Sequence, residues 1–200
     1  MDAIATRAWM QRFFAAFDRE QQALTDLDRQ SGDGDFGANL RSALGRARTG
    51  LAGTATATPG DVFEVMSTAF LHTGGTSGPL FGMWFRQLAK ATRVAEVGVA
   101  ELAAGFADAT AAVQRLGGAE PGDKTMVDAM VPAAEALAAA SDVQDGLIAA
   151  ARAARVGADA TADLLARRGR ASYVGEVARR VLDPGAVAVA LLVESAPADE

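Results

Sequence analysis

Apolar residues recur at helical spacing along almost the whole chain, and no segment shows the alternation that is typical of a β-strand. The first predicted helix runs from about residue 3 to residue 24, with Trp9, Phe13, Phe14 and Phe17 on one side. Capping residues and glycine stops predict further helices over about 37–50, 61–72, 80–89, 95–117 and 124–140, one that begins after the N-cap Ser141, and one that follows residues 183–185.

The helix after Ser141 carries its apolar residues as one stripe. The spacing predicts that Leu147, Ala151, Ala154, Ala158 and Leu165 are buried together. About eight helices joined by short loops favour an all-α fold, an up-and-down bundle of antiparallel neighbours.

Length and composition are consistent with a single domain. Half of the 200 residues are hydrophobic, which allows a substantial core, and no stretch has the composition of a linker. We therefore expect one domain over residues 1–200, with a frayed tail from about Pro197.

Charge and cysteine content narrow the functional classes. The formal net charge of −6 argues against non-specific nucleic-acid binding. No apolar run approaches the roughly 20 residues that span a bilayer, and the N-terminus lacks the apolar segment of a signal peptide. The absence of cysteine excludes disulfides and thiolate sites and fits a reducing compartment, so we expect a cytoplasmic protein without nucleic-acid or membrane partners.

The irregular, glycine-rich breaks between helices carry the unusual chemistry. They cover residues 28–39, 74–79, 117–125, 169–175 and 183–185. Because the loops of an up-and-down bundle lie at one end or the other, several of these segments could converge and build a single site.

The first break holds Asp28, Asp33 and Asp35 within eight residues. An EF-hand loop is excluded, because a loop that starts at Asp33 would place Gly37 at the fifth ligand position and Leu44 at the twelfth, where glutamate is required. The spacing suits a hard cation such as Mg²⁺, which takes few protein carboxylates. The open alternative is an exposed acidic turn whose aspartates cap helices.

The other breaks are each ambiguous when taken alone. Backbone N–H groups of residues 74–78 could cradle a phosphate, or form a flexible turn. Asp123 could cap a helix with Lys124 and Thr125 in its first turn. The arginines of residues 167–170 suit a phosphate or form a surface patch, and residues 183–185 could simply be a turn. The single histidine, His72, is interpreted as structural.

The five segments occur in an order that resembles the nucleotide-binding L subunit of dihydroxyacetone kinase. The motifs are D-x3-GDGDxGxN, GGTSGPLFG, PGDKTMVDAMVPA, RRGRASYVGE and DPGA, and they run from about Asp28 to Ala186. PGDKTM and GRASYxGE are the most specific of them.

This resemblance implies a fold and a set of site residues. The fold would be a closed barrel of eight antiparallel amphipathic helices that binds ADP or ATP with a pair of magnesium ions at one end. The magnesium ligands would be Asp28, Asp33 and Asp35. The nucleotide would be bound by Phe36, Gly37, Ala38, Asn39, Thr76, Ser77, Gly117, Met126, Arg170, Asp183, Pro184 and Gly185. No protein side chain would act as a nucleophile, because phosphoryl transfer depends mainly on positioning and charge neutralisation.

The resemblance also implies partners. A separate K subunit would hold the ketose, and the phosphoryl donor would be either a phosphohistidine carrier protein or ATP. The sequence does not decide the ketose, the donor or whether the chain forms a homodimer.

The chain departs from the family pattern in two places. Phe36 and the pair Val181-Leu182 stand where the family usually has histidine and His-Gln. Phe36 cannot donate a hydrogen bond to a phosphate, so this departure bears on the nucleotide affinity and on the identity of the phosphoryl donor. A second hypothesis is therefore a non-catalytic module that binds a nucleotide or an apolar ligand and regulates a partner.

Overall fold

The computed structural model describes residues 1–197, and within this range the chain is helical without a β-strand. No described helix is both long and apolar enough to cross a membrane. The helices are α1 (Ala3–Ser31), α2 (Phe36–Gly53), α3 (Pro59–Leu71), α4 (Ser77–Ala91), α5 (Val99–Gly117), α6 (Val127–Ala138), α7 (Val143–Ala160), the one-turn α8 (Ala171–Val174) and α9 (Pro184–Glu194).

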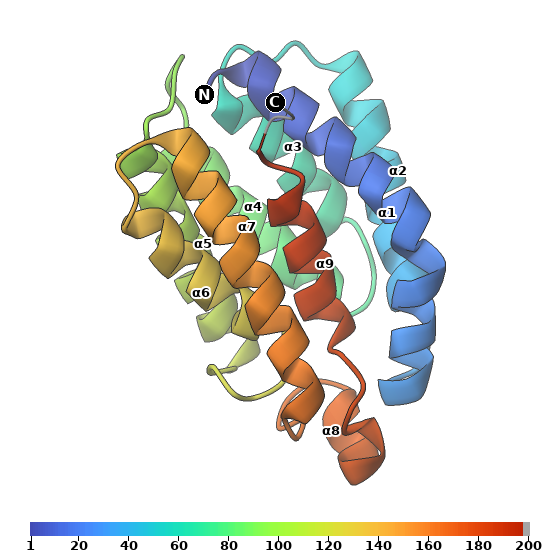
Figure 1. The fold of residues 1–200 in the computed structure, drawn as a ribbon. Helices are drawn as coiled ribbons and strands as arrows, with labels where there is room; N and C mark the ends of the chain where they lie inside the picture. The colour runs from blue at the N-terminus through green and yellow to red at the C-terminus, as the bar shows by residue number, and fades with distance from the viewer. Residues whose placement is uncertain (198–200) are drawn as a thin grey trace.

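The eight long helices form a closed ring. Each packs against its neighbours in sequence, and α9 packs against both α7 and α1 (Figure 1). The indole N–H of Trp9 donates to the carbonyl of Leu192 at 2.7 Å, and Arg12 donates to the carbonyls of Ser195 and Ala196. These bonds join the first helix to the last, so the predicted closed up-and-down barrel is confirmed, with α8 as an additional short turn.

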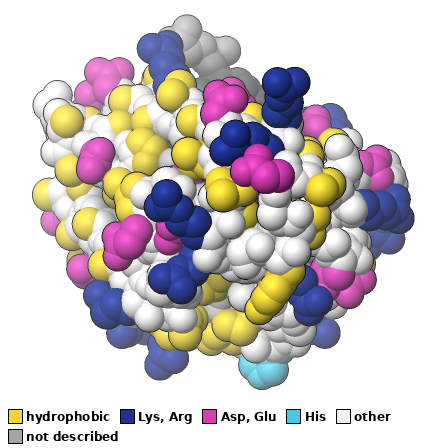
Figure 2. Space-filling view, turned by 90° about the horizontal axis from the view of Figure 1, so that it is seen from below, with side chains coloured by type: hydrophobic (Ala, Val, Ile, Leu, Met, Phe, Trp, Pro, Cys, Tyr) yellow, Lys and Arg dark blue, Asp and Glu magenta, His cyan; other side chains and the backbone are white. Residues whose placement is uncertain are grey.

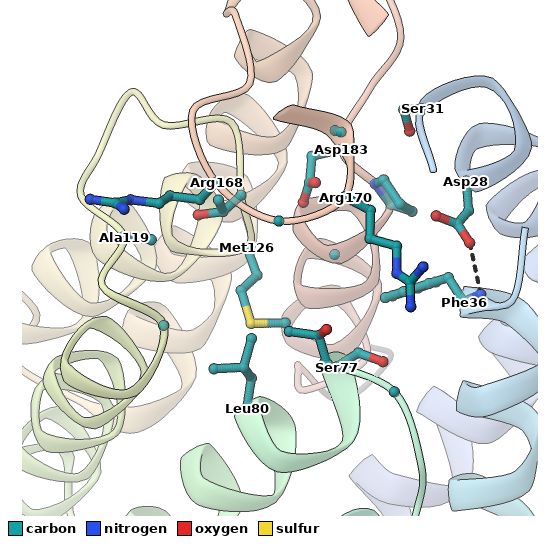
Figure 3. Close-up of a pocket in the computed structure, with 18 of the residues that line it drawn as sticks. Asp28, Ser31, Phe36, Ser77, Leu80, Ala119, Met126, Arg168, Arg170 and Asp183 are labelled. Atoms are coloured by element: carbon teal, nitrogen blue, oxygen red, sulfur yellow. Dashed lines mark hydrogen bonds between the residues drawn. The ribbon is translucent and has the colours of Figure 1, made fainter. Parts of the chain in front are cut away.

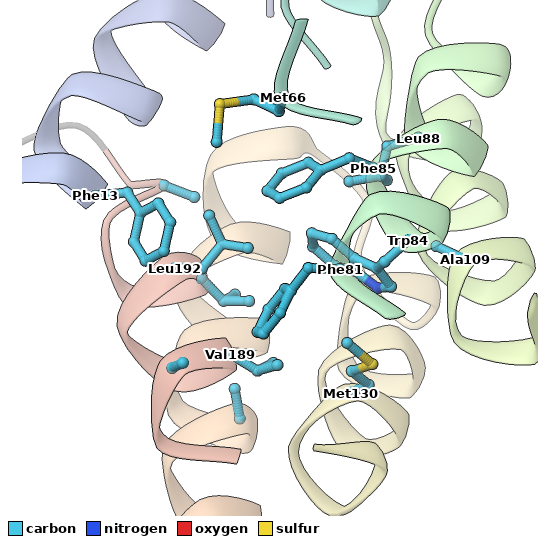
Figure 4. Packing of buried hydrophobic residues seen from close by; sticks show 14 of the residues in the cluster. Phe13, Met66, Phe81, Trp84, Phe85, Leu88, Ala109, Met130, Val189 and Leu192 are labelled. Atoms are coloured by element: carbon cyan, nitrogen blue, oxygen red, sulfur yellow. The ribbon is translucent and has the colours of Figure 1, made fainter. Parts of the chain in front are cut away.

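Aromatic side chains fill the interior of the ring (Figure 4). Phe85 is central to them, with ring centroids 5.3 Å from Trp84, 5.5 Å from Phe70 and 6.2 Å from Phe63. Trp9 meets Phe63 edge to face at 5.6 Å. Close packing of this kind leaves the middle of the barrel occupied by the protein itself.

The alternation of helix direction sorts the loops by end. Residues 32–35, 72–76, 118–126 and 161–183 lie at one end, and both termini lie at the other with the remaining loops (Figure 1). We call the first end the site end and the second the distal end. The predicted convergence of the glycine-rich breaks is thus confirmed, and Figure 2 views the molecule from the site end, where acidic and basic side chains are interspersed.

Several predicted helix boundaries were wrong. Helix α1 continues past residue 24 to Ser31, and Asp28 lies on its last turn instead of in a loop. Helix α6 begins at Val127 and not at Lys124, because Lys124 has a φ of 62°, which is incompatible with a right-handed helix. Helix α5 begins at Val99 rather than near residue 95.

The start and the stripe of α7 also differ from the prediction. Asp142, and not Ser141, caps this helix by accepting the N–H of Asp145 at 2.9 Å. Leu165 lies beyond the end of α7 at Ala160 and is 37% exposed, so it does not belong to the buried stripe. The other four members are buried as predicted. The predicted frayed tail falls mostly on residues 198–200, outside the described residues.

Candidate functional site

A pocket of about 380 Å³ opens at the site end of the barrel (Figure 3). Its wall comes from the ends of α1 and α5, the turn between α1 and α2, the starts of α2, α4 and α9, and the loops before α6 and α8. Most residues that the sequence predicted for a site line this pocket: Asp28, Asp33, Asp35, Phe36, Asn39, Thr76, Ser77, Gly117, Met126, Arg170, Asp183, Pro184 and Gly185.

Two predicted residues, Gly37 and Ala38, do not line the pocket. Gly37 faces α1, where an added Cβ would collide with the hydroxyl of Thr25 and come within 3.2 Å of the carbonyl of Gln21. This glycine therefore permits the close approach of α2 to α1.

Asp28 is the most enclosed of the three aspartates, with 8% of its surface exposed. Its Oδ2 accepts the backbone N–H of Phe36 at 2.8 Å, which ties the end of α1 to the start of α2. Burial raises the pKa of Asp28, the Phe36 N–H lowers it, and the nearby charge of Asp33 raises it again. Burial is the largest of these effects, so the net shift of the Asp28 pKa is upward.

Asp33 is neutralised by an arginine from a distant segment. The Nη1 of Arg170 lies 2.8 Å from Oδ2 of Asp33, and the Asp33 side chain is 32% exposed. Asp35 donates its N–H to Oδ1 of Asp33 at 3.4 Å, while its own carboxylate makes no capping bond to α2.

The chemistry of these donors fits a hard cation. Three carboxylates offer oxygen ligands only, and a guanidinium already occupies the place of a positive charge beside Asp33. In the conformation described, however, no three acidic or histidine side chains among residues 1–197 are grouped closely enough to hold a metal ion. The ligand types therefore fit magnesium, while their assembly requires side-chain movement.

The starts of α2 and α4 lack caps from their own N-cap residues, although the first N–H of α2, that of Phe36, is bonded to Asp28. Neither Asp35 nor Thr76, the N-cap residues of these helices, makes a side-chain capping bond. Gly75 has a φ of 79°, and an added Cβ would lie 2.7 Å from the amide nitrogen of Asn39, so this turn packs closely on the start of α2. First-turn N–H groups that face a pocket suit an anion.

The opposite part of the wall is apolar. It is formed by Leu80, Val113, Met126, Val127 and Pro184, and Figure 3 shows the Met126 side chain above Leu80. A flat, weakly polar group would fit against these side chains, next to the polar end of the pocket.

Lys124 is an internal tie between two loops of the site. Only 1% of it is exposed, and its Nζ donates to the carbonyls of Thr161 at 2.5 Å and Val181 at 2.7 Å. Burial lowers the pKa of Lys124, and the charge of Asp183 opposes this effect. The lysine thus joins the loop before α6 to both ends of the segment between α7 and α9.

Asp183 caps α9 inside the pocket. It accepts the N–H of Ala186 at 2.7 Å, and its own N–H donates to the hydroxyl of Thr161 at 2.9 Å. Burial raises the pKa of Asp183 to about 7, an effect that the Ala186 N–H reduces and the charge of Asp128 increases. At neutral pH this group therefore exists in both protonation states.

Other lining residues were not predicted individually, although all except Leu80, Val113 and Val127 belong to the breaks between helices that the sequence singles out. They are Ser31, Gly75, Leu80, Val113, Ala119, Lys124, Thr125, Val127, Arg168, Gly169 and Ala171. The apolar members follow the same helical spacing as core residues, so no sequence signal distinguished them. His72 is exposed outside the pocket, with Nδ1 2.7 Å from the carbonyl of Thr68, in accord with its structural interpretation.

The similarity to known proteins covers the part of the chain that contains these pocket residues. A family model described as the DAK2 domain matches residues 30–197. The chain is 37% identical over 192 residues to the ADP-binding subunit DhaL of the PEP-dependent dihydroxyacetone kinase of Escherichia coli, covering 93% of this chain and 91% of that protein. It is 39% identical to the L-erythrulose 1-kinase of Mycolicibacterium smegmatis over 84% of this chain, but over only 31% of that longer protein.

A solved structure has the same fold. The dihydroxyacetone kinase of C. freundii, in complex with AMP-PNP and Mg²⁺, superposes with a TM-score of 0.73 at 27% identity, covering 98% of this chain and 33% of that one. With a family match over most of its length and a relative of nearly equal length, the chain belongs to the DAK2 domain family, as the ordered motifs predicted.

Proposed function

We propose that this chain is the nucleotide-binding subunit of a kinase that phosphorylates a short ketose such as dihydroxyacetone. It would bind ADP or ATP with magnesium and act on a ketose held by a separate subunit. One observation carries the proposal: three aspartates, two uncapped helix starts and an apolar wall face one pocket at one end of the barrel. The E. coli relative of similar length is named as an ADP-binding subunit, which supports the need for a partner.

The polar part of the pocket would hold the metal and the phosphates. Asp28, Asp33 and Asp35 would be the ligands of a pair of magnesium ions, which when bound neutralise phosphate charge during transfer. Asn39, Thr76 and Ser77 would contact phosphate oxygens together with first-turn N–H groups of α4. Phe36 contributes only its backbone N–H, already bonded to Asp28, and a hydrophobic ring.

The apolar part would hold the base. Met126 and Gly117 would lie against it from the α5–α6 side, and the turn of residues 183–185 would close the pocket from the start of α9. The lining contains no histidine or cysteine, and phosphoryl transfer requires none, because positioning and charge neutralisation supply most of the rate.

A non-catalytic nucleotide-binding module is the second candidate. The departure at Phe36 favours it, because one phosphate donor expected of the family is absent. An apolar ligand inside the barrel is not supported, since aromatic side chains fill that volume. A coupled assay with a sugar-holding subunit separates the two candidates: ketose phosphate formation supports the kinase, and binding without turnover supports the module.

Further parts of the proposal concern donor and location. A phosphohistidine carrier as donor fits the PEP dependence named for the E. coli relative, and direct use of ATP is the alternative. A cytoplasmic location fits the absence of cysteine. Homodimer formation stays a prediction for sedimentation analysis.

Calorimetric titration of ADP and ATP, with and without magnesium, tests the binding site. We expect magnesium-dependent binding that weakens on the order of 100-fold in Asp33→Ala, given that each 1.4 kcal/mol is a tenfold change. The control is Asp108→Ala, which removes an exposed carboxylate on α5 outside the pocket. Binding that ignores magnesium, or that Asp33→Ala leaves unchanged, would refute the site assignment.

A further inference from the structure

The segment between η1 (Thr161–Asp163) and α9 forms one side of the pocket, and its middle is weakly held, although Lys124 ties its end at Val181. Helix α8, in its middle, buries none of its residues, and Tyr173 and Val177 are 91% and 75% exposed. Gly169 and Gly175, on either side of α8, have positive φ values of 66° and 64°. A segment with few buried apolar contacts opens at low free-energy cost.

One ion pair joins this segment to the acidic turn. Among the ion pairs of residues 1–197, those of Arg167 and Arg168 go to Asp123, in the loop before α6, while that of Arg170 alone reaches the turn between α1 and α2. Figure 3 shows the Arg170 side chain extending across the pocket toward Phe36 and the Asp28 carboxylate. Arg170 therefore spans the pocket mouth.

The partner of Arg170 is one of the three aspartates assigned to the metal. The Nη1 of Arg170 lies 2.8 Å from Oδ2 of Asp33, and Oδ2 of Asp28 accepts the N–H of Phe36. With these bonds in place, the three carboxylates are not gathered around one point. A divalent cation on Asp33 and the guanidinium of Arg170 would compete for the same oxygen.

The strength of the pair decides the outcome of that competition. The Arg170 and Asp33 side chains are 64% and 32% exposed. Ion pairs of such exposure contribute about 0–1 kcal/mol, so a divalent cation that binds several carboxylates can displace the arginine.

We infer that Arg170 is the built-in counter-cation of the metal site and latches the 164–183 segment to Asp33 until a divalent cation displaces it. Displacement loosens the segment and frees the guanidinium for the nucleotide phosphates, where it closes the pocket again. This inference rests on the proposed function, because it takes Asp33 as a metal ligand. It assigns opposite effects to one residue: Arg170 weakens the binding of metal alone and strengthens the binding of the magnesium nucleotide.

Magnesium titration without nucleotide tests the competition. We expect Arg170→Ala to bind Mg²⁺ about 3- to 6-fold more tightly than the unmodified chain, which corresponds to losing a pair of at most about 1 kcal/mol. The matched control, Arg167→Ala, removes the same charge from the same segment but leaves Asp33 untouched, and should change the affinity less than twofold. With ADP present, Arg170→Ala should bind more weakly than the unmodified chain.

Hydrogen exchange measures how tightly the ion pair holds the segment, first without metal and then with magnesium. Asp33→Ala should raise exchange of the amides of residues 169–178 severalfold, as magnesium should in the unmodified chain, while magnesium should add nothing in Arg170→Ala. Asp26→Ala is the control, because Asp26 lies on the preceding helix α1 and pairs with Arg29 instead of Arg170. Unchanged exchange in Asp33→Ala overturns the latch.

The outcomes separate the two proposals. Magnesium affinity that Arg170→Ala leaves unchanged or lowers overturns the competition while the proposed function stands. Absence of magnesium binding in every variant, with and without nucleotide, overturns the metal assignment and this inference together.

Discussion

The two ends of the barrel are built from the same helices, but the N-termini of the helices are capped differently at each end. At the distal end, Asp2, Thr58 and Asp142 each accept a backbone N–H from the first turn of the helix that they precede. Glu101 performs the reciprocal half of a capping box by accepting the N–H of Gly98 at 3.1 Å. Every long helix that begins there is therefore stabilised by its own local sequence.

At the site end, the starts of α2 and α4 lack a cap from their own N-cap residues, whereas α9 is capped by Asp183. Asp35 and Thr76 are capping residue types, but neither makes a capping bond in the described structure. Order there comes from the long-range bonds of Lys124 to Thr161 and Val181. Within the loop before α6 it comes from the carboxylate of Asp128, which accepts the N–H groups of Gly122 and Thr125. The difference teaches that every long helix start at the distal end is capped locally, whereas α2 and α4 begin without such a cap beside the place where a phosphate is proposed to bind.

Among the substitutions considered, replacing the buried Lys124 should reduce the stability of the site end most. Lys124→Met leaves the carbonyls of Thr161 and Val181 without their donor, and unsatisfied buried acceptors cost about 1–3 kcal/mol. We expect urea unfolding to show a loss of about 2–3 kcal/mol, with weaker nucleotide binding because the loops before α6 and α9 separate. Lys90→Met, at an exposed position on α4, is the control. A loss no larger than that of the control would mean that Lys124 is not a structural tie.

The second largest effect should come from the ionisation of Asp183, which makes the stability of the site end depend on pH. Because its pKa is raised from 3.8 to about 7 in the folded chain, its contribution to stability is full below about pH 4 and is lost as the pH rises toward 7. Asp183→Asn keeps an oxygen for the Ala186 N–H but cannot ionise. Relative to the unmodified chain, this variant should gain on the order of 1–2 kcal/mol between pH 5 and pH 8, after discounting for partial exposure.

Denaturant unfolding at both pH values measures this difference. Asp145→Asn, an exposed carboxylate near the distal end, supplies the control. A pH-independent difference between Asp183→Asn and the unmodified chain would contradict the raised pKa.

A pair of threonine substitutions gives the smallest but most direct comparison. Thr58→Ala removes a capping box and should cost about 1 kcal/mol of stability without changing nucleotide affinity. Thr76→Ala removes no capping bond, so it should cost less than about 0.5 kcal/mol while weakening nucleotide binding. Thermal unfolding gives the stability of each variant, and calorimetry gives its nucleotide affinity. A stability loss at Thr76 equal to that at Thr58 would remove the contrast between the two ends.

Sequence patterns predicted the fold and most of the lining, and they failed where contacts are distant in the chain. The aromatic stripe of α1 and the proline and aspartate at the start of α3 are local signals, and both elements form as predicted in type. Lys124 was assigned to a first helical turn because its neighbours suit one. Its left-handed backbone and its bonds to Thr161 and Val181 become visible only when residues some 40 to 60 positions away pack against it.

By itself, the sequence determined that this protein is a helical barrel of a recognisable family with three aspartates in one short segment. Helical spacing and ordered motifs carry that information, because they depend on neighbours along the chain. The tertiary structure decided how those aspartates are partnered: Asp28 on a helix end and bonded to Phe36, and Asp33 held by Arg170 from 137 positions away. Burial and ion pairing depend on which segments meet in space, and no local pattern encodes that meeting.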